Sequence, residues 1–283
     1  MNYRHGFHAG NFADVMKHAI LARLVTYLKG KTAAFRVIDT HAGRGRYDLL
    51  SREGERSPEW RDGIARLLTA DFPAAVEDLL APYLDVVRGE NPQGGVTVYP
   101  GSPLLIRRLL RSQDRLSALD LHPEEYAELA TLFAGDIQTR ATLLDGWLAL
   151  PAFLPPKEKR GLVLVDPPFE LPGEFERLAM GLAKAHRRFS AGLFALWYPV
   201  KDPTEIDDFI HALETTAIPR MLRVELTVRP PSTPPRLHGS GLIIVNPPFT
   251  LEAELQLLLP ALAGVLSDAG RGSYRLDWIR RED

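Results

Sequence analysis

Short apolar runs separated by stretches of helical length are the feature that most restricts the fold of this chain. Five such runs occupy residues 35–39, 116–121, 141–144, 161–165 and 193–198. Most of the segments between them are long enough to hold a helix that connects parallel strands. Alternation of this kind predicts an α/β fold with a parallel sheet and covering helices.

The end of the chain follows a different pattern. Residues 221–228 and 241–245 are also strand-like, but the proline-rich segment 229–236 between them is too short for a crossover helix. These two strands are therefore expected to pair antiparallel. The predicted sheet is mostly parallel, with an antiparallel end strand.

The segment between the first two parallel strands is unusually long. Asp39 and Asp120 end these strands and are separated by far more than the roughly 30 residues of a strand-helix-strand unit. Residues 57–69 and 74–87 have helix-like patterns. We therefore predict one domain formed by residues 1–47 and 99–283, interrupted by an inserted helical subdomain over residues 48–98.

The beginning of the chain predicts another helix. Residues 11–29 carry apolar side chains close to the helical repeat, and Gly30 is positioned to end the helix. An amphipathic helix is expected here. Lys17 and His18 lie on one turn of it, where they either bind a carboxylate or lie at the surface.

Composition narrows the function classes. The sequence has no cysteine, which excludes disulfides, thiolate metal sites and cysteine nucleophiles. No stretch is long and apolar enough to span a membrane, and the first residues lack the apolar core of a signal peptide, so a cytoplasmic location is expected. The net charge of -2 gives no global attraction for phosphates, so a nucleic-acid surface must be a local patch.

Residues 166–169, Asp-Pro-Pro-Phe, follow the fourth predicted parallel strand. They therefore lie at the carboxyl edge of the sheet, where open α/β sheets bind ligands. An adenine amino nitrogen is a poor nucleophile because its lone pair is delocalised into the ring, and the Asp166 carboxylate with the Pro167 carbonyl can accept its hydrogens. Pro168 stiffens the turn and Phe169 offers a stacking surface. The alternative is that the prolines simply end a strand.

A second copy of this pattern, Asn246-Pro247-Pro248-Phe249, follows the predicted antiparallel strand. Motif matching alone does not separate the two copies. Their order in the chain does, because the substrate loop is expected after the fourth parallel strand. A structural role is therefore predicted for Asn246.

Residues after the other strands favour a nucleoside cofactor. Gly43 and Gly45 allow the backbone to approach a ligand closely. Asp120 can accept hydrogen bonds from ribose hydroxyls, and Asp145-Gly146 follows the strand where adenine-ring contacts are expected. Each feature also has a plainer interpretation: a tight connection, a solvated acid and a common turn pair.

Ser102 and Pro103 are predicted to be the N-cap and first residue of a helix, a position that also attracts carboxylates. No three histidines or acids near the amino terminus fall at a recognised ligand spacing, so no metal site is expected. Phosphate contacts are expected from arginines only where they gather at the mouth of the site. The candidates are Arg44, Arg46, Arg107, Arg108, Arg111, Arg187 and Arg188.

These motifs occur together, and in this order, in one known family. Its marker is the run Tyr3-Arg4-His5, Phe7-His8-Ala9-Gly10-Asn11, Ala13-Asp14-Val15 and Lys17-His18, followed by Asp39-Thr40-His41-Ala42-Gly43, Tyr99-Pro100-Gly101-Ser102-Pro103, Leu121-His122-Pro123, Asp145-Gly146 and Leu196-Trp197-Tyr198-Pro199. Over essentially its whole length the chain resembles the bacterial 23S rRNA adenine-N6 methyltransferases of the RlmJ family. The resemblance implies a class I (Rossmann-like) methyltransferase fold and S-adenosyl-L-methionine as cofactor.

The resemblance also implies roles for particular residues. The cofactor should contact Lys17, His18, His41, Ser102, Asp120, Asp145, Gly146 and Asp166. Asp166 should also be the catalytic residue, with Pro167, Pro168 and Phe169 at the substrate base and Tyr3 and Arg4 at the RNA. Phe169 stands where the family commonly has tyrosine, and Asp120 where glutamate also occurs. Stacking and ribose binding survive both changes.

The expected activity is methylation of the N6 amino group of a specific adenine in 23S rRNA, as naked RNA or in an early assembly intermediate. A monomer without an obligate protein partner or a membrane association is expected. Two alternatives stay open: a DNA adenine-N6 methyltransferase with the same amine chemistry, and a non-catalytic RNA-binding assembly factor on a decayed methyltransferase fold. The intact sequence from Asp166 to Pro168 argues against decay.

Overall fold

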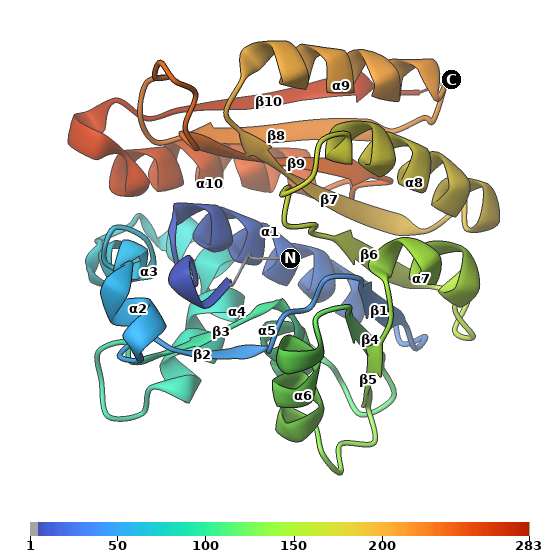
Figure 1. Ribbon diagram of the computed structural model, residues 1–283, viewed down its shortest axis with the longest axis horizontal. Coiled ribbons are helices and arrows are strands. Elements are labelled where there is room, and N and C mark those ends of the chain that lie inside the picture. The colour runs from blue at the N-terminus through green and yellow to red at the C-terminus, as the bar shows by residue number, and fades with distance from the viewer. Residues whose placement is uncertain (1–4, 283) are drawn as a thin grey trace.

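The computed structural model describes residues 5–282, which contain an eight-stranded sheet in the order β10-β8-β9-β7-β6-β1-β4-β5 (Figure 1). Five neighbouring strands run parallel. They are β1 (Arg36–Asp39), β4 (Arg115–Asp120), β5 (Thr139–Leu143), β6 (Gly161–Val165) and β7 (Leu193–Val200). Each coincides with a predicted strand, so the α/β prediction is confirmed.

The remaining strands of this sheet are β8 (Met221–Thr227), β9 (Gly239–Val245) and β10 (Ser273–Arg280). The predicted antiparallel pairing of β8 with β9 is confirmed. However, β9 lies between β7 and β8, and the edge of the sheet is formed by β10, which pairs antiparallel with β8. Strand β10 was not among the predicted strands, although its apolar residues Tyr274, Leu276 and Trp278 alternate with polar ones. Its side chains are all exposed or half-buried.

Helix α1 (Phe12–Lys29) begins at Asn11, whose side chain accepts hydrogen bonds from the backbone N–H groups of Ala13 and Asp14, and it ends at Gly30 as predicted. The prediction of an amphipathic helix was wrong, because most of its residues are buried on all faces. Helices α4, α5 and α10 and strand β9 all pack against α1. Lys17 and His18 are consequently buried.

The long connection between β1 and β4 contains a two-stranded antiparallel sheet, β2 (Arg46–Asp48) with β3 (Val98–Pro100). Between these strands lie α2 (Arg52–Arg56), η2 (Glu59–Arg61), α3 (Ile64–Thr69) and α4 (Ala74–Glu90). Figure 1 shows α2 and α3 on the side of the molecule where α1 begins. Ile64, Leu80 and Tyr83 belong to the same buried cluster as the side chains of α1. The helices are thus present, while the boundaries of a separate subdomain stay a prediction.

Two apolar clusters, associated with different sets of helices, enclose the sheet. The other helices are η1 (His5–Phe7), α5 (Ser102–Leu109), α6 (Pro123–Leu132), α7 (Gly146–Phe153), α8 (Glu174–Arg188), α9 (Pro203–Thr215), α10 (Leu251–Leu266) and η3 (Asp268–Gly270). Within residues 5–282, no helix has the length and apolar character needed to cross a membrane. The parallel strands bring the loops after β1, β4, β6 and β7 to one edge of the sheet.

Candidate functional site

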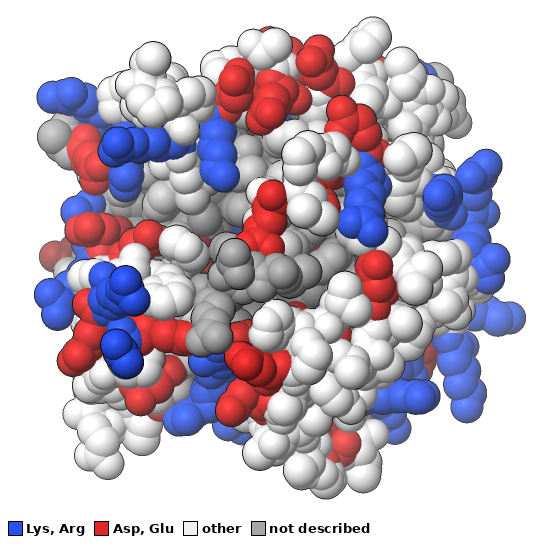
Figure 2. Space-filling model, viewed as in Figure 1, with Lys and Arg blue, Asp and Glu red and all other residues white. Residues whose placement is uncertain are grey.

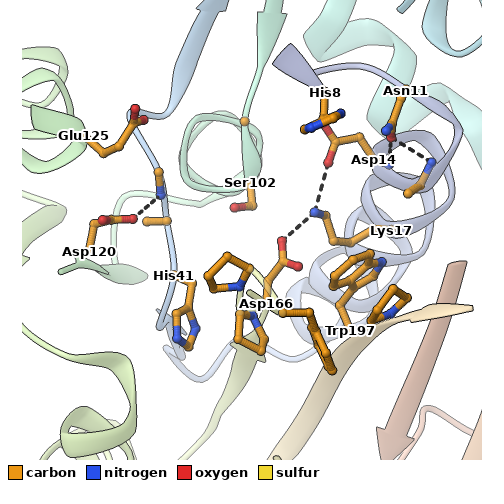
Figure 3. Close-up of a pocket in the computed structure, with 18 of the residues that line it drawn as sticks. His8, Asn11, Asp14, Lys17, His41, Ser102, Asp120, Glu125, Asp166 and Trp197 are labelled. Carbon is orange, nitrogen blue, oxygen red and sulfur yellow. Dashed lines mark hydrogen bonds and ion pairs between the residues drawn. The ribbon is translucent and has the colours of Figure 1, made fainter. Parts of the chain in front are cut away.

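A cleft of about 400 Å³ opens at this edge, between α1 and the loops that follow the parallel strands (Figure 3). Most of the site residues expected from the sequence line it. They are Lys17, His18, His41, Ser102, Asp120, Asp166, Pro167, Pro168 and Phe169. The fold therefore brings together side chains from α1, β4, α5 and the loops after β1 and β6.

A buried group of three charges occupies one wall of the cleft. Lys17 Nζ lies 2.9 Å from Asp14 Oδ1 and 2.5 Å from Asp166 Oδ2, and the Lys17 side chain is only 4% exposed. The Trp197 ring lies beneath the cation, 5.6 Å from Nζ to the ring centroid. Burial lowers the pKa of Lys17, but the two carboxylates outweigh it, and the pKa is raised above its ordinary value. Lys17 is therefore cationic and fixes the orientation of the Asp166 carboxylate.

The Asp-Pro-Pro-Phe turn has an unusual backbone at its last residue. Phe169 has φ +49°, in the left-handed region that non-glycine residues seldom adopt. Its ring packs edge-on against Phe175 and Trp197, with centroid distances of 4.9 and 5.8 Å. These contacts hold Phe169 at the wall of the cleft in a conformation that surrounding structure must maintain.

Asp39, at the end of β1, lies behind the wall of the cleft next to Ser102. Ser102 Oγ donates to Asp39 Oδ2 over 2.7 Å, while Asp39 Oδ1 has no hydrogen-bond partner among residues 5–282. Complete burial raises the pKa of Asp39 to about 7, and the negative charge of Asp166 adds to this effect. The N-cap prediction for Ser102 was wrong: Gly101 is the N-cap of α5, since the serine side chain turns to Asp39 instead.

Asp120 is held at the end of β4 by two backbone groups. It accepts hydrogen bonds from the N–H of Gly43 and of His122, both over 2.8 Å. Burial is the main cause that raises the pKa of Asp120. Gly43 has φ +59°, and a Cβ at this position would lie 2.3 Å from Tyr47 Oη. The positive φ and the contact with Tyr47 both favour glycine at this position of the β1 loop.

Two of the histidines that line the cleft, His18 and His41, are mostly covered. His18 Nδ1 lies 2.7 Å from Tyr99 Oη, and the two rings stack with centroids 5.5 Å apart. His41 Nδ1 lies 2.8 Å from Thr40 Oγ1. Burial lowers the pKa of His41 to about 4, so its imidazole is neutral near pH 7.

Asp145 and Gly146 are not among the residues that line the cleft. Asp145 is the N-cap of α7 and accepts a hydrogen bond from Trp147 N over 2.8 Å. A Cβ at Gly146 would lie 2.4 Å from the backbone oxygen of Thr40, so Gly146 packs directly against the β1 loop. Their cofactor contacts stay a prediction, and the structure shows them supporting the loop that carries His41.

The arginines expected to contact RNA are not gathered at the cleft. Tyr3 and Arg4 lie outside the described residues. The seven candidate arginines are all described, and none of them lines the cleft. Arg44 pairs with Glu53 and with Glu125, which itself lines the cleft. Most of the others are engaged elsewhere: Arg46 and Arg108 with Glu90, Arg107 with Asp136, Arg111 with Asp114, and Arg188 with the Leu154 oxygen. Within residues 5–282, no group of three or more histidines and acids is arranged to hold a metal ion.

The structural interpretation of Asn246 is confirmed. Its side-chain amide donates both hydrogens, to the backbone oxygens of Ser190 and Gly192, each over 2.8 Å. These bonds fix the turn between α8 and β7. By contrast, sequence reasoning did not assign Asp14 or Trp197 to the charged group around Lys17. The three-residue spacing of Asp14 and Lys17 on one helix was the available signal.

Comparison with known proteins now places the chain among its relatives. The sequence profile of the family described as "Ribosomal RNA large subunit methyltransferase D, RlmJ" matches residues 32–280. The chain belongs to the RlmJ family. Two relatives named "Ribosomal RNA large subunit methyltransferase J" cover nearly the whole chain. The protein from Escherichia coli (strain K12) is 43% identical over 280 residues, which are 99% of each chain. The protein from Haemophilus influenzae is 40% identical over 284 residues, which are 100% of each chain.

The solved structure of another protein has the same fold as this chain. Protein LPL1258 from Legionella pneumophila matches with a TM-score of 0.86 and 35% identity, covering 96% of this chain and 98% of that one. The class I, Rossmann-like methyltransferase fold predicted from the sequence is confirmed.

Proposed function

We propose that this RlmJ-family protein transfers a methyl group from S-adenosyl-L-methionine to the N6 amino group of a specific adenine in 23S rRNA. The observation that carries the proposal is the Asp166 carboxylate, fixed by buried Lys17 on a double-proline turn in the cleft. The named relatives support ribosomal RNA of the large subunit as the substrate class. The specific base and nitrogen rest on the amine chemistry of the turn and on the resemblance.

The residues of the cleft fit the cofactor. Asp120 uses one lone pair on each oxygen for backbone N–H groups, which leaves others for ribose hydroxyls. Asp39 lies behind the cleft wall and holds Ser102 at the start of α5 by accepting a hydrogen bond from Ser102 Oγ. Gly101 and Ser102 begin α5, where backbone N–H groups suit a carboxylate. Asp145 and Gly146 are proposed to contact the cofactor at the β1 loop.

The turn after β6 fits the target base. The Asp166 carboxylate and the Pro167 carbonyl accept the two hydrogens of the adenine amine, which localises its lone pair on nitrogen. Asp166 Oδ2 is held by Lys17, while Oδ1 makes no hydrogen bond to any of residues 5–282. Phe169 stacks on the base, supported by Phe175 and Trp197. The slot therefore orients an amine and an aromatic ring together.

Catalysis follows mainly from positioning. The adenine is turned out of the RNA stack into the cleft, as enzymes that modify bases require. S-adenosyl-L-methionine supplies an electrophilic methyl group when bound. Asp166, Pro167 and Phe169 aim the amine nitrogen, and holding two reactants in line contributes roughly 7 to 11 kcal/mol toward the barrier. The proton leaves the amine after transfer.

The finer properties are proposed with the activity. The substrate is naked 23S rRNA or an early assembly intermediate, because the cleft must receive an accessible adenine. The enzyme acts in the cytoplasm, as a monomer without an obligate protein partner. Tyr3 and Arg4 are proposed to contact the RNA.

The test is transfer of labelled methyl from S-adenosyl-L-methionine to unmodified 23S rRNA, with nucleoside analysis of the product. The expected product is N6-methyladenosine at one site, with no transfer to 16S rRNA or to duplex DNA. Activity on duplex DNA alone would identify a DNA methyltransferase instead. Measurable cofactor binding without transfer to any of these substrates would support the non-catalytic alternative.

A further inference from the structure

Two exposed cations, Lys201 and Arg236, lie just outside the paired ends of β7 and β9. Lys201 directly follows β7, is exposed and lines the cleft together with Leu237. The backbone N–H of His238 donates to Val200 O over 3.1 Å, so the end of the segment 229–238 runs beside Lys201. Arg236, two residues before His238, is exposed in the same segment. The antiparallel pairing of β7 with β9 thus brings Lys201 and Arg236 to one side of the cleft.

The segment that carries Arg236 is stiff for a surface loop. Residues 229–238 connect β8 to β9 and contain four exposed prolines, each of which fixes φ and lacks an N–H group. The loop is closed at its base, where Val228 N donates to His238 O over 2.9 Å. A cation on such a loop loses less conformational entropy when it binds a ligand.

The ion pairs around the site distinguish Lys201 and Arg236 from neighbouring cations. Within residues 5–282, neither forms an ion pair, whereas Lys17 and Arg44 are paired, and Arg229 at the start of the loop contacts Asp268 at 3.2 Å. Figure 2 shows acidic and basic side chains interspersed on this face, so attraction for a polyanion depends on individual cations.

Lys201 also acts electrostatically on a residue that lines the cleft. The Glu59 carboxylate raises the pKa of His8, and Lys201 acts on the same histidine in the opposite direction. His8 lines the cleft from the segment before α1. Lys201 therefore lies close enough to act on an anion at the mouth.

We propose that Lys201 and Arg236 form a cation clamp, which binds the phosphates on either side of the target nucleotide once its base has entered the cleft. This assignment rests on the proposed function and names the part of the RNA that these residues recognise. A flipped nucleotide leaves its two flanking phosphates at the entrance, because the backbone must run past the opening. Two unpaired cations on a stiff rim match that arrangement in charge.

The test compares Lys201→Gln/Arg236→Gln with a control, Lys31→Gln/Lys184→Gln. Lys31 precedes β1 and Lys184 lies in the second half of α8, which leads to the start of β7, so both exposed control residues lie away from the cleft edge of the sheet. The clamp variant should raise KM for RNA about tenfold. It should also lower the dependence of log KM on log salt by roughly 1.4, that is about 0.7 for each phosphate of a single strand. Its kcat at saturating RNA and its cofactor affinity should equal those of the wild type.

A second measurement locates the phosphates. RNA with uncharged methylphosphonate linkages on both sides of the target adenine should raise the KM of the wild-type enzyme by about the same factor. For the clamp variant, the same substrate should raise KM no further. If the two losses simply add, or if the clamp variant keeps the wild-type KM and salt dependence, the proposal is overturned. Because each result is referred to methyl transfer by the wild type, failure of the proposed activity would be seen separately.

Discussion

The turns at residues 166–169 and 246–249 are near copies, Asp-Pro-Pro-Phe and Asn-Pro-Pro-Phe, and each follows a buried strand. Strand β6 runs parallel to its neighbours, whereas β9 runs antiparallel to β7. The first turn therefore ends at the cleft and the second at the opposite edge. Asp166 is held by a cation, while Asn246 is held by two backbone oxygens.

The phenylalanines of the two turns also differ in their surroundings. Phe169 is partly buried against Phe175 and Trp197, whereas Phe249 is 83% exposed and meets only the edge of Tyr27 among residues 5–282. Both turns have a residue with positive φ, but at opposite ends: Phe169 in one and Asn246 in the other. The same four-letter pattern thus acquires its role from the direction of the strand before it.

The largest effect is expected at the charged residue of the first turn. Asp166→Asn removes one of the two acceptors for the amine and should lower kcat by about 10² to 10³-fold. The amide oxygen can still accept from Lys17, so cofactor affinity should be largely retained. Single-turnover transfer to 23S rRNA and cofactor titration measure the two quantities. Normal methylation by this variant would remove Asp166 from the catalytic role.

The reciprocal change tests the second turn. Asn246→Asp replaces two donated hydrogen bonds with a carboxylate that faces the oxygens of Ser190 and Gly192. Unfolding by urea should show a loss of about 2 to 4 kcal/mol. The activity of the folded enzyme should be unchanged. Adding this substitution to Asp166→Asn should restore nothing, and recovery of activity would contradict the assignment by strand direction.

Truncating the two phenylalanines gives a smaller contrast. Phe169→Ala should weaken use of RNA through loss of stacking, which is worth roughly 1 to 3 kcal/mol for one base. Phe249→Ala should change stability by less than about 0.5 kcal/mol, because the ring is mostly solvated. KM for RNA and the urea midpoint are the measurements. Equal effects at the two positions would contradict the comparison.

The smallest effect concerns pH. Because Asp39 titrates near pH 7 in the fold instead of at its ordinary value of 3.8, the folded state binds the extra proton. The free energy of unfolding therefore decreases through Asp39 as pH rises from about 4 to about 7, and Asp39 causes no further decrease above pH 7. Asp166→Asn should shift the upper end of this window to lower pH, since the charge of Asp166 helps to raise the pKa of Asp39. Asn246→Asp should not shift it. Urea midpoints from pH 4 to 8, referenced to Asp39→Asn, measure both.

Much of the sheet is predictable from local pattern because buried parallel strands are continuous apolar runs. The edge strand β10 is not such a run: its apolar and polar residues alternate, and its side chains are exposed or half-buried. Helix α1 was recognised, but its burial on all faces was missed. That burial depends on α4 and α10, which are distant in sequence.

The functional site, too, was only partly predictable from the sequence. The strand ends predict Asp120 and Asp166 at one edge, because parallel strands share their direction. Lys17 and Ser102 reach their partners through tertiary packing over 149 and 63 residues of sequence, which no local pattern contains.

The burial of α1 by distant helices affects the state of the chain while it is being synthesised. This helix leaves the ribosome before α10, which covers part of it and is completed only at Leu266. During synthesis of the intervening segments, the apolar side chains of α1 lack that cover, a condition that favours aggregation. Nascent chains that end before α10 should therefore bind chaperones more strongly than the finished protein.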